Sequence, residues 1–149
     1  ALVAGGLAPA DVGVITPYAA QVRCISDALG DLAESSSARG GGGVQVRTVD
    51  GFQGREKEAI VLSAVRSNGQ GITGFLRDWR RLNVSVTRAR RALIVIGDSR
   101  TLANDEHWAA FVKQARKQGA FAALPSAGVA DGAWLAATCR ASPTSDSSA

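Results

Sequence analysis

The sequence contains few of the residues that build metal sites and disulfide frameworks. It has two cysteines and a single histidine in 149 residues. Cys24 and Cys139 lie far apart and match no metal-ligand spacing, so we expect free thiols. Free thiols favour a reducing, intracellular compartment, cytoplasmic or nuclear. His107 has no second histidine with which to complete a metal set, so we predict no metal site formed by this chain.

Long apolar runs and methionine are also missing. No stretch approaches the roughly 20 apolar residues that a membrane-spanning helix needs, so we expect no membrane partner. The chain begins with ALVAGG, which lacks the basic segment of a secretory signal, and it contains no Met. These absences favour a part of a longer polypeptide over a secreted protein.

The residues that are present have the composition of one ordinary globular domain with an excess of arginine. Hydrophobic residues make up 46% of the chain and charged residues 20%. Of the 17 Lys and Arg residues 14 are Arg, against 13 acidic residues, and the net charge is +4. Arginine makes planar, bidentate contacts with phosphate and carboxylate groups. The charge balance therefore permits an anionic partner without requiring one.

Short apolar runs alternate with helical patterns along the chain. Three runs have the composition of buried strands, 12–16, 59–65 and 92–96, and residues 44–48, VQVRT, alternate apolar and polar side chains as a strand does. Apolar residues at helical spacing predict three helices: 18–34, 78–90 and 106–118. Thr16 with Pro17 and Asp78 have the residue types of helix starts, and Gly119 that of a helix end. The alternation predicts an α/β fold, a three-layer domain with a mostly parallel central sheet.

Low-complexity segments divide the chain. Residues 125–149 are rich in Ala, Ser and Gly and are predicted to form a flexible tail, which leaves 1–124 as the folded domain. Residues 35–43, SSSARGGGG, are predicted to form a linker after the first helix.

The first segment that carries chemistry is TVDGFQGRE, residues 48–56, at the end of a predicted strand. Ligands of open α/β sheets bind at the carboxyl ends of strands. Glycines let backbone amides approach a phosphate closely, and the Glu56 carboxylate can accept hydrogen bonds from sugar hydroxyls. A polar loop with glycine-dependent turns explains the same pattern without a ligand.

The second segment, residues 77–91, holds six arginines and one acid. On the predicted helix, Arg80, Thr87 and Arg88, with Arg91 beyond them, recur at three- and four-residue spacings. Such spacing brings several guanidinium groups to one patch, as a polyphosphate site requires. A solvated basic helix face is the alternative explanation.

The third segment, TPYAAQ, follows the first predicted strand. Tyr18 is the only tyrosine and could stack on a base, and Gln21 could hydrogen-bond one. A helix start with a half-buried ring is the alternative. Together the three segments place polar groups at strand ends, which we expect to meet at one edge of one sheet.

These segments are similar to a known family. VGVITPYAAQ, VQVRTVDGFQGREKEAIVLSAVRSN and GFLRDWRRLNVSVTRARRALIVIGD resemble, in order, motifs IV, V and VI of superfamily 1 helicases. They most resemble the branch that contains senataxin and the nonsense-mediated decay RNA helicase, from about Asp11 to Phe121. The resemblance implies the second of two RecA-like domains, of the P-loop NTPase fold, that close on ATP and on single-stranded RNA or DNA.

The resemblance also implies roles for particular residues. It casts Arg88 as the arginine finger that reaches the γ-phosphate, where a guanidinium neutralises charge on the transferring phosphoryl oxygens. Glu56 would hold the ribose of ATP. The other cofactor-binding positions that it implies are Gln53, Gly54, Tyr18, Gln21 and Arg91. The implied nucleic-acid-binding positions are Thr48, Val49 and Asn83.

Two departures limit these implications. Some members carry Arg directly after the motif IV glutamine, where this chain has Val22, with Arg23 one helical step of about 100° further on. The chain also has no Gly-Lys pair, hence no GxxxxGK[ST] phosphate loop, and no acidic strand-end pair resembling Walker B. ATP and Mg²⁺ would then be held mainly by an upstream RecA-like lobe of the same polypeptide, and the isolated chain is predicted to be inactive.

Two functions remain open at this point. The first is the C-terminal motor lobe of an ATP-dependent 5′-to-3′ helicase. The alternative is a non-catalytic RecA-like module that binds nucleic acid or protein. A phosphate loop and Walker B motif encoded shortly before Ala1 would favour the enzyme, and their absence would favour the binding module.

Overall fold

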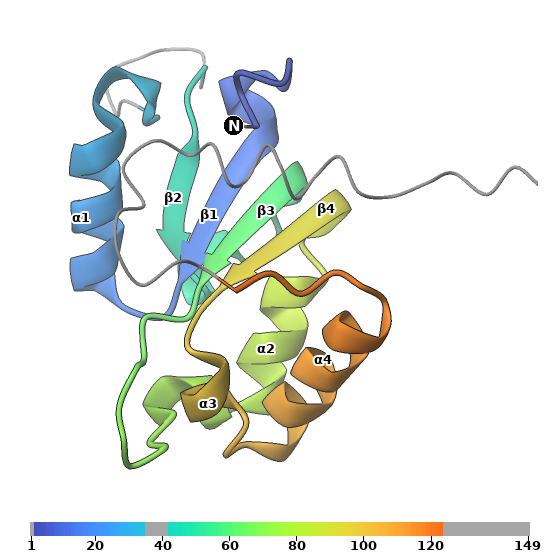
Figure 1. Ribbon diagram of the computed structural model, residues 1–149. Coiled ribbons are helices and arrows are strands. Elements are labelled where there is room, and N and C mark those ends of the chain that lie inside the picture. Colours follow the sequence, from blue (N-terminus) through green and yellow to red (C-terminus); the bar gives the residue numbers. More distant parts are fainter. Residues whose placement is uncertain (1, 35–41, 124–149) are drawn as a thin grey trace, which may run out of the picture.

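The computed structural model describes residues 2–34 and 42–123, and its described part is built on one sheet (Figure 1). The strands are β1 (Val12–Thr16), β2 (Gln45–Thr48), β3 (Lys57–Ser63) and β4 (Ala89–Ile96). All pair in parallel, in the order β2-β1-β3-β4. The predicted tail 125–149 and most of the predicted linker 35–43 lie outside the described residues.

Helices lie on both faces of the sheet. The α-helices are α1 (Ala19–Leu29), α2 (Trp79–Val86), α3 (Ser99–Leu102) and α4 (Glu106–Lys117). Short 3-10 helices are η1 (Pro9–Asp11), η2 (Gly30–Leu32), η3 (Asp50–Phe52) and η4 (Gly74–Arg77). Figure 1 shows α1 on one face and α2 with α4 on the other. The predicted three-layer α/β fold with a parallel sheet is confirmed. In the described residues, no helix is long and apolar enough to cross a bilayer.

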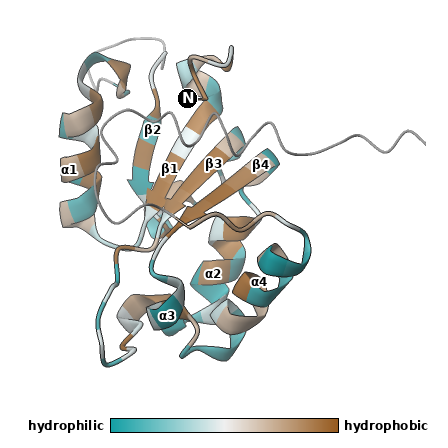
Figure 2. Cartoon of the chain, viewed as in Figure 1, coloured by the Kyte–Doolittle hydropathy of each residue, from teal (hydrophilic) through white to brown (hydrophobic). Residues whose placement is uncertain are grey.

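The sheet buries apolar side chains on both faces, as the brown strands of Figure 2 indicate. Facing α1 lies a cluster of Val12, Val14, Val44 and Val46. On the other face Ile15, Phe52, Ile60, Leu62 and Trp108 belong to a second cluster. Trp108 of α4 is 1% exposed, and its indole Nε1 donates to the Leu76 carbonyl at 2.8 Å. That bond satisfies the polar end of the ring and joins α4 to η4.

Gly13, in the middle of β1, allows the chain between β2 and β3 to pass close to the sheet. A Cβ on Gly13 would lie 2.6 Å from Cζ of Phe52 and 2.8 Å from Cδ1 of Ile60. Phe52 is fully buried there. Residues 49–56 therefore cross the face that carries α2 and α4, from the end of β2 to the start of β3.

One predicted helix start and one predicted helix end are wrong. Thr16 is the last residue of β1, and α1 begins only after Tyr18, whose extended backbone (φ −121°, ψ 127°) makes Tyr18 the N-cap residue. Helix α2 ends at Val86 instead of Arg90. Ala89 already pairs with Lys57 across the sheet, so strand pairing overrides the helical spacing of the arginines.

The remaining boundaries agree more closely with the pattern. The Asp78 carboxylate accepts the N–H of Arg80 at 3.0 Å and caps α2 as predicted. Helix α4 ends at Lys117, just before Gly119. The end of α1 is the exception: the helix ends at Leu29 instead of the predicted 34, so this boundary is wrong as well, because Gly30 interrupts the helix.

Candidate functional site at two edges of the sheet

The predicted site residues lie at two opposite edges of the sheet. Because the strands are parallel, their carboxyl ends share one edge, formed by Thr16, Thr48, Ser63 and Ile96. Lys57 and Ala89 pair at the other edge, where β3 and β4 begin. We call these the carboxyl edge and the amino edge. At about 3.3 Å per residue, the length of β3 separates them by roughly 20 Å.

The expectation that all three segments meet at one edge is wrong. Residues 77–91 precede β4 instead of following a strand, so they lead toward the amino edge. Arg88 stands directly before β4, and Arg91 lies within β4. The predicted convergence of these arginines required one continuous helix, but Arg80 lies in the first turn of α2 and the helix ends at Val86.

The amino edge carries exposed ion pairs between β3 and β4. Nε of Arg90 lies 3.3 Å from Oε2 of Glu56, the residue before β3. Arg90 also lies 3.6 Å from Glu58, whose second oxygen pairs with Nε of Arg91 at 2.8 Å. The side chains of Arg90 and Glu56 are 60% and 48% exposed, so water competes with their contact.

Gln53 and Gly54 lie exposed on the same approach to β3. Gly54 has φ of +74°, a conformation that glycine adopts without steric strain. Five predicted residues thus lie on or beside the amino edge: Gln53, Gly54, Glu56, Arg88 and Arg91.

The Arg88 side chain folds back on the end of α2. Its Nε donates to the Val84 carbonyl at 3.1 Å, and Nη2 donates to Oγ1 of Thr87 at 3.1 Å. The Thr87 hydroxyl in turn donates to the Asn83 carbonyl at 2.8 Å. A guanidinium at this position is favoured by the negative end of the helix dipole.

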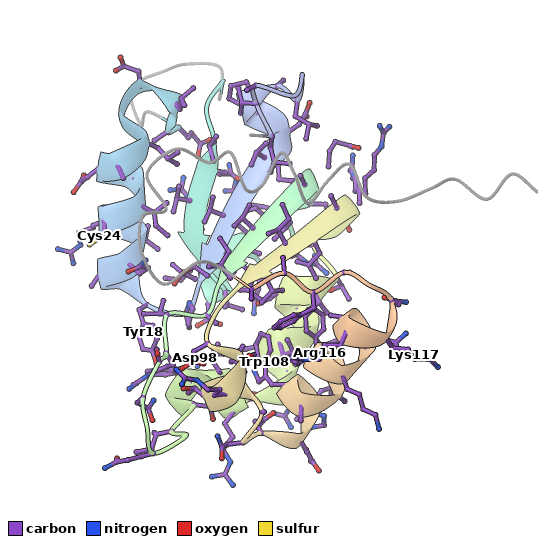
Figure 3. All side chains as sticks on the ribbon, in the orientation of Figure 1. Tyr18, Cys24, Asp98, Trp108, Arg116 and Lys117 are labelled. Carbon is purple, nitrogen blue, oxygen red and sulfur yellow. The ribbon has the colours of Figure 1, made fainter. Side chains whose placement is uncertain are left out.

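Tyr18, Gln21 and Thr48 lie at the carboxyl edge. The Tyr18 hydroxyl accepts a hydrogen bond from Nε of Arg66 at 2.6 Å, and Figure 3 labels Tyr18 where the strands end. Gln21 is half-buried in the first turn of α1. Oγ1 of Thr48 accepts the N–H of Gly51 at 3.2 Å. The structure thus brings Tyr18 and Gln21 together with Thr48, and leaves them far from Glu56.

Two predicted nucleic-acid-binding residues differ in exposure. Val49 is 5% exposed and its side chain packs in the core, so only its backbone can face a ligand. Asn83 is exposed on α2.

Sequence reasoning missed four residues that the structure brings to these edges: Arg66, Phe75, Arg81 and Arg90. Arg66 follows β3, so the strand-end rule that selected Tyr18 also applied to it. Nη2 of Arg81 pairs with Asp50 at 3.2 Å, a contact between α2 and η3 that no local pattern indicates.

Asp98 holds the loop that follows β3. Its carboxylate accepts the N–H of Arg100 at 3.0 Å and the hydroxyl of Ser67 at 2.9 Å. These hydrogen bonds stabilise the ionised form and lower the pKa of Asp98 from 3.8 to about 2. Asp98 therefore fixes both the start of α3 and the loop beginning at Arg66.

Comparison with known proteins decides the family. A family model described as an AAA domain matches residues 1–100. Over 104 residues the chain is 49% identical to DNA-binding protein SMUBP-2 of Mesocricetus auratus, covering 70% of this chain and 10% of that protein. Over 117 residues it is 43% identical to ATP-dependent helicase NAM7 of Saccharomyces cerevisiae, covering 76% and 12%. The chain belongs to the superfamily 1 helicases.

A third relative of this helicase domain is the DNA replication ATP-dependent helicase/nuclease DNA2 of Mus musculus, 51% identical over 98 residues, which cover 65% of this chain and 9% of that protein. The chain thus spans about a tenth of the length of these relatives. The matched residues 1–100 contain all four strands described above, and therefore both edges.

Proposed function

We propose that this superfamily 1 helicase domain is the C-terminal RecA-like motor lobe of an ATP-dependent 5′-to-3′ helicase on single-stranded RNA or DNA. The amino edge completes an ATP site together with an upstream RecA-like lobe of the same polypeptide. The carboxyl edge contacts the single-stranded RNA or DNA. The relatives NAM7, named as an ATP-dependent helicase, and SMUBP-2, named as a DNA-binding protein, support the two halves of this proposal.

The observation that carries the proposal is the path of residues 49–56. The segment leaves Thr48 at the carboxyl edge and ends at Glu56 on the amino edge. Phe52, fully buried against Ile60 and Gly13, packs its middle on the sheet. Because a closely packed segment moves as a unit with the sheet, it can link the occupancy of one edge to the geometry of the other.

The side chains of the amino edge fit the parts of ATP. Arg88 supplies positive charge for the γ-phosphate, a contribution worth on the order of 10³–10⁵ in rate in nucleoside triphosphatases. Glu56 accepts hydrogen bonds from the ribose hydroxyls, in place of its exposed contact with Arg90. Arg91 in β4 supplies a further cation at the amino edge, and Gln53 and Gly54 lie on the segment that leads into β3.

Metal binding is assigned to the upstream lobe. In residues 2–34 and 42–123, no group of three or more His, Cys, Asp or Glu residues is placed to hold a metal ion. Mg²⁺ neutralises phosphate charge in such sites and is held there by carboxylates and substrate phosphates. This chain then contributes guanidinium groups, and the metal ligands come from outside it.

In this proposal Tyr18 and Gln21 contact the single-stranded nucleic acid, together with Thr48 and the backbone of Val49. Their place at the carboxyl edge, roughly 20 Å from Glu56, supports this assignment over the nucleotide side. Asn83, exposed on α2, is a further candidate contact to the single-stranded nucleic acid.

The test is the ATPase activity of the full-length protein, with and without single-stranded RNA or DNA. Arg88→Ala should lower kcat by about 10³-fold and leave strand affinity within about twofold. Lys113→Ala, which removes an exposed cation from α4, should change neither. Equal losses of turnover and of affinity for single-stranded nucleic acid in Arg88→Ala would mean that Arg88 contacts the nucleic acid instead of ATP.

The same assay separates the alternative function. A full-length protein that binds single strands without hydrolysing ATP would be a non-catalytic binding module. Turnover by the 149-residue chain alone would contradict the two-lobe proposal.

A further inference from the structure

Four side chains from separate segments meet at the carboxyl edge and form what we call the aromatic cluster: Tyr18, Arg66, Phe75 and Arg81. The rings of Tyr18 and Phe75 lie edge to face, with centroids 5.8 Å apart at 80°. The Arg66 guanidinium lies 5.3 Å from the Tyr18 centroid, and that of Arg81 lies 5.2 Å from the Phe75 centroid. Cation–π and edge-to-face contacts therefore hold both rings.

The cluster is anchored from two further sides. A Cβ on Gly74 would lie 3.1 Å from Nη2 of Arg66 and 3.2 Å from the Tyr18 hydroxyl, so both side chains pack directly on this backbone. Asp50 binds Arg81 at 3.2 Å, and Asp50 stands two residues after Thr48. The cluster is thus preorganised beside the residues proposed to contact the strand.

Phe75 nevertheless remains 54% exposed. Ile72 and Trp79 beside it in sequence are 52% and 55% exposed. Four arginines occur in the surrounding segments, at positions 66, 77, 80 and 81, against the carboxylates of Asp50 and Asp78. An exposed ring held by the Arg81 guanidinium, in a region of net positive charge, has the two properties of a site that stacks a base and attracts a phosphate backbone.

We propose that Phe75, positioned by Tyr18 and Arg81, stacks on a base of single-stranded nucleic acid. This inference rests on the proposed strand-binding role of the carboxyl edge. Stacking needs a flat, exposed π face, which Phe75 offers and the buried Phe52 does not. Because every base has a π face, the contact shows little sequence preference. Because the bases of a duplex are already stacked on one another, the contact favours single strands.

The experiment measures fluorescence anisotropy of the full-length protein with a labelled 20-nucleotide oligo(dT) strand and with an abasic strand of equal length. Phe75→Ala and Phe75→Leu should each bind oligo(dT) about tenfold more weakly, and Phe75→Trp should bind like the unaltered protein. Leu32→Ala, which removes an exposed apolar side chain at η2, should have no effect. On the abasic strand, all five proteins should bind alike.

The outcomes separate this inference from the proposed function. A full-length protein that binds neither strand overturns both. Strand binding that Phe75→Ala leaves unchanged overturns only the stacking role. Full binding by Phe75→Leu, or an equal loss on the abasic strand, also overturns it, since the side chain would then act as an apolar packing surface.

Discussion

The two edges of this sheet are built by different physical means. The amino edge is built from exposed ion pairs between neighbouring strands, such as Glu56 with Arg90. Such pairs contribute only about 0–1 kcal/mol each, so a ligand can displace them at small cost. At the carboxyl edge, Tyr18 and Phe75 are held by contacts from four segments of the chain. The comparison indicates one adjustable edge and one preformed edge.

That difference suits the two ligands that we propose. A nucleotide that enters and leaves in every cycle requires side chains that exchange partners easily, as Glu56 and Arg90 can. A strand that is held through the cycle benefits from a surface that is already ordered, because ordering side chains on binding costs free energy. Residues 49–56 join the two edges, and Phe52 packs that connection on the sheet.

The largest effect is expected where the two edges are joined. Phe52→Ala should lower the free energy of unfolding by about 3–5 kcal/mol, because it leaves a cavity over Gly13 and Ile60. Phe75→Ala, the matched change at a phenylalanine that is 54% exposed, should cost only about 1 kcal/mol, the contribution of its edge-to-face contact with Tyr18. Urea denaturation of the two variants checks this. Similar losses in both would mean that Phe52 is not the packing centre of the connection.

A smaller effect should be confined to the amino edge. Glu56→Ala in the full-length protein should raise the KM for ATP about tenfold, since a carboxylate hydrogen bond contributes about 1.5–3 kcal/mol. Strand affinity should stay the same. Glu106→Ala, at an exposed carboxylate at the start of α4, is the control. An unchanged KM, or a parallel loss of strand binding, would break the proposed separation of the edges.

The smallest effect concerns the support of the carboxyl edge. The pKa of Asp98 is lowered to about 2 in the folded chain, so its stabilising contribution is complete above pH 3.8 and is lost as the pH falls toward 2. The unaltered chain should therefore lose more stability than Asp98→Asn between pH 5 and pH 3. Asp27→Asn, at an exposed position of α1, should follow the unaltered chain. Equal pH dependence in all three would remove this role.

The sequence predicted β1 and β2 well because a strand that packs in the core has a recognisable pattern of apolar residues within a few positions. The apolar run 12–16 coincides with β1, since a strand covered on both faces requires apolar residues at successive positions. The alternating residues 44–48 coincide closely with β2. It predicted the start of β4 poorly. Arg90 and Arg91 are polar enough to fit a helix, and they lie in a strand because Ala89 and Ala92 on either side of them pair with Lys57 and Ala59 of β3.

The sequence selected the candidate site residues but did not predict how they are arranged in space. Glu56, Arg88 and Thr48 were each selected from motifs or strand ends, which are local features. Their division between two edges depends on residues 49–56 crossing the sheet, and the direction of that crossing has no local signature. Arg66 and Phe75 were missed for a related reason, because their contacts with Tyr18 join positions 48 and more residues apart.

The sequence by itself determined the family, the α/β fold and the residue types available for phosphate, sugar and base contacts. These follow from hydrophobic periodicity and from motifs, each contained in a short stretch of chain. Only the tertiary structure decided that Tyr18 lies with Thr48 and that Glu56 lies with Arg90. The reason is that a parallel sheet assigns each residue to an edge by strand direction and register, and both arise from pairing between distant segments.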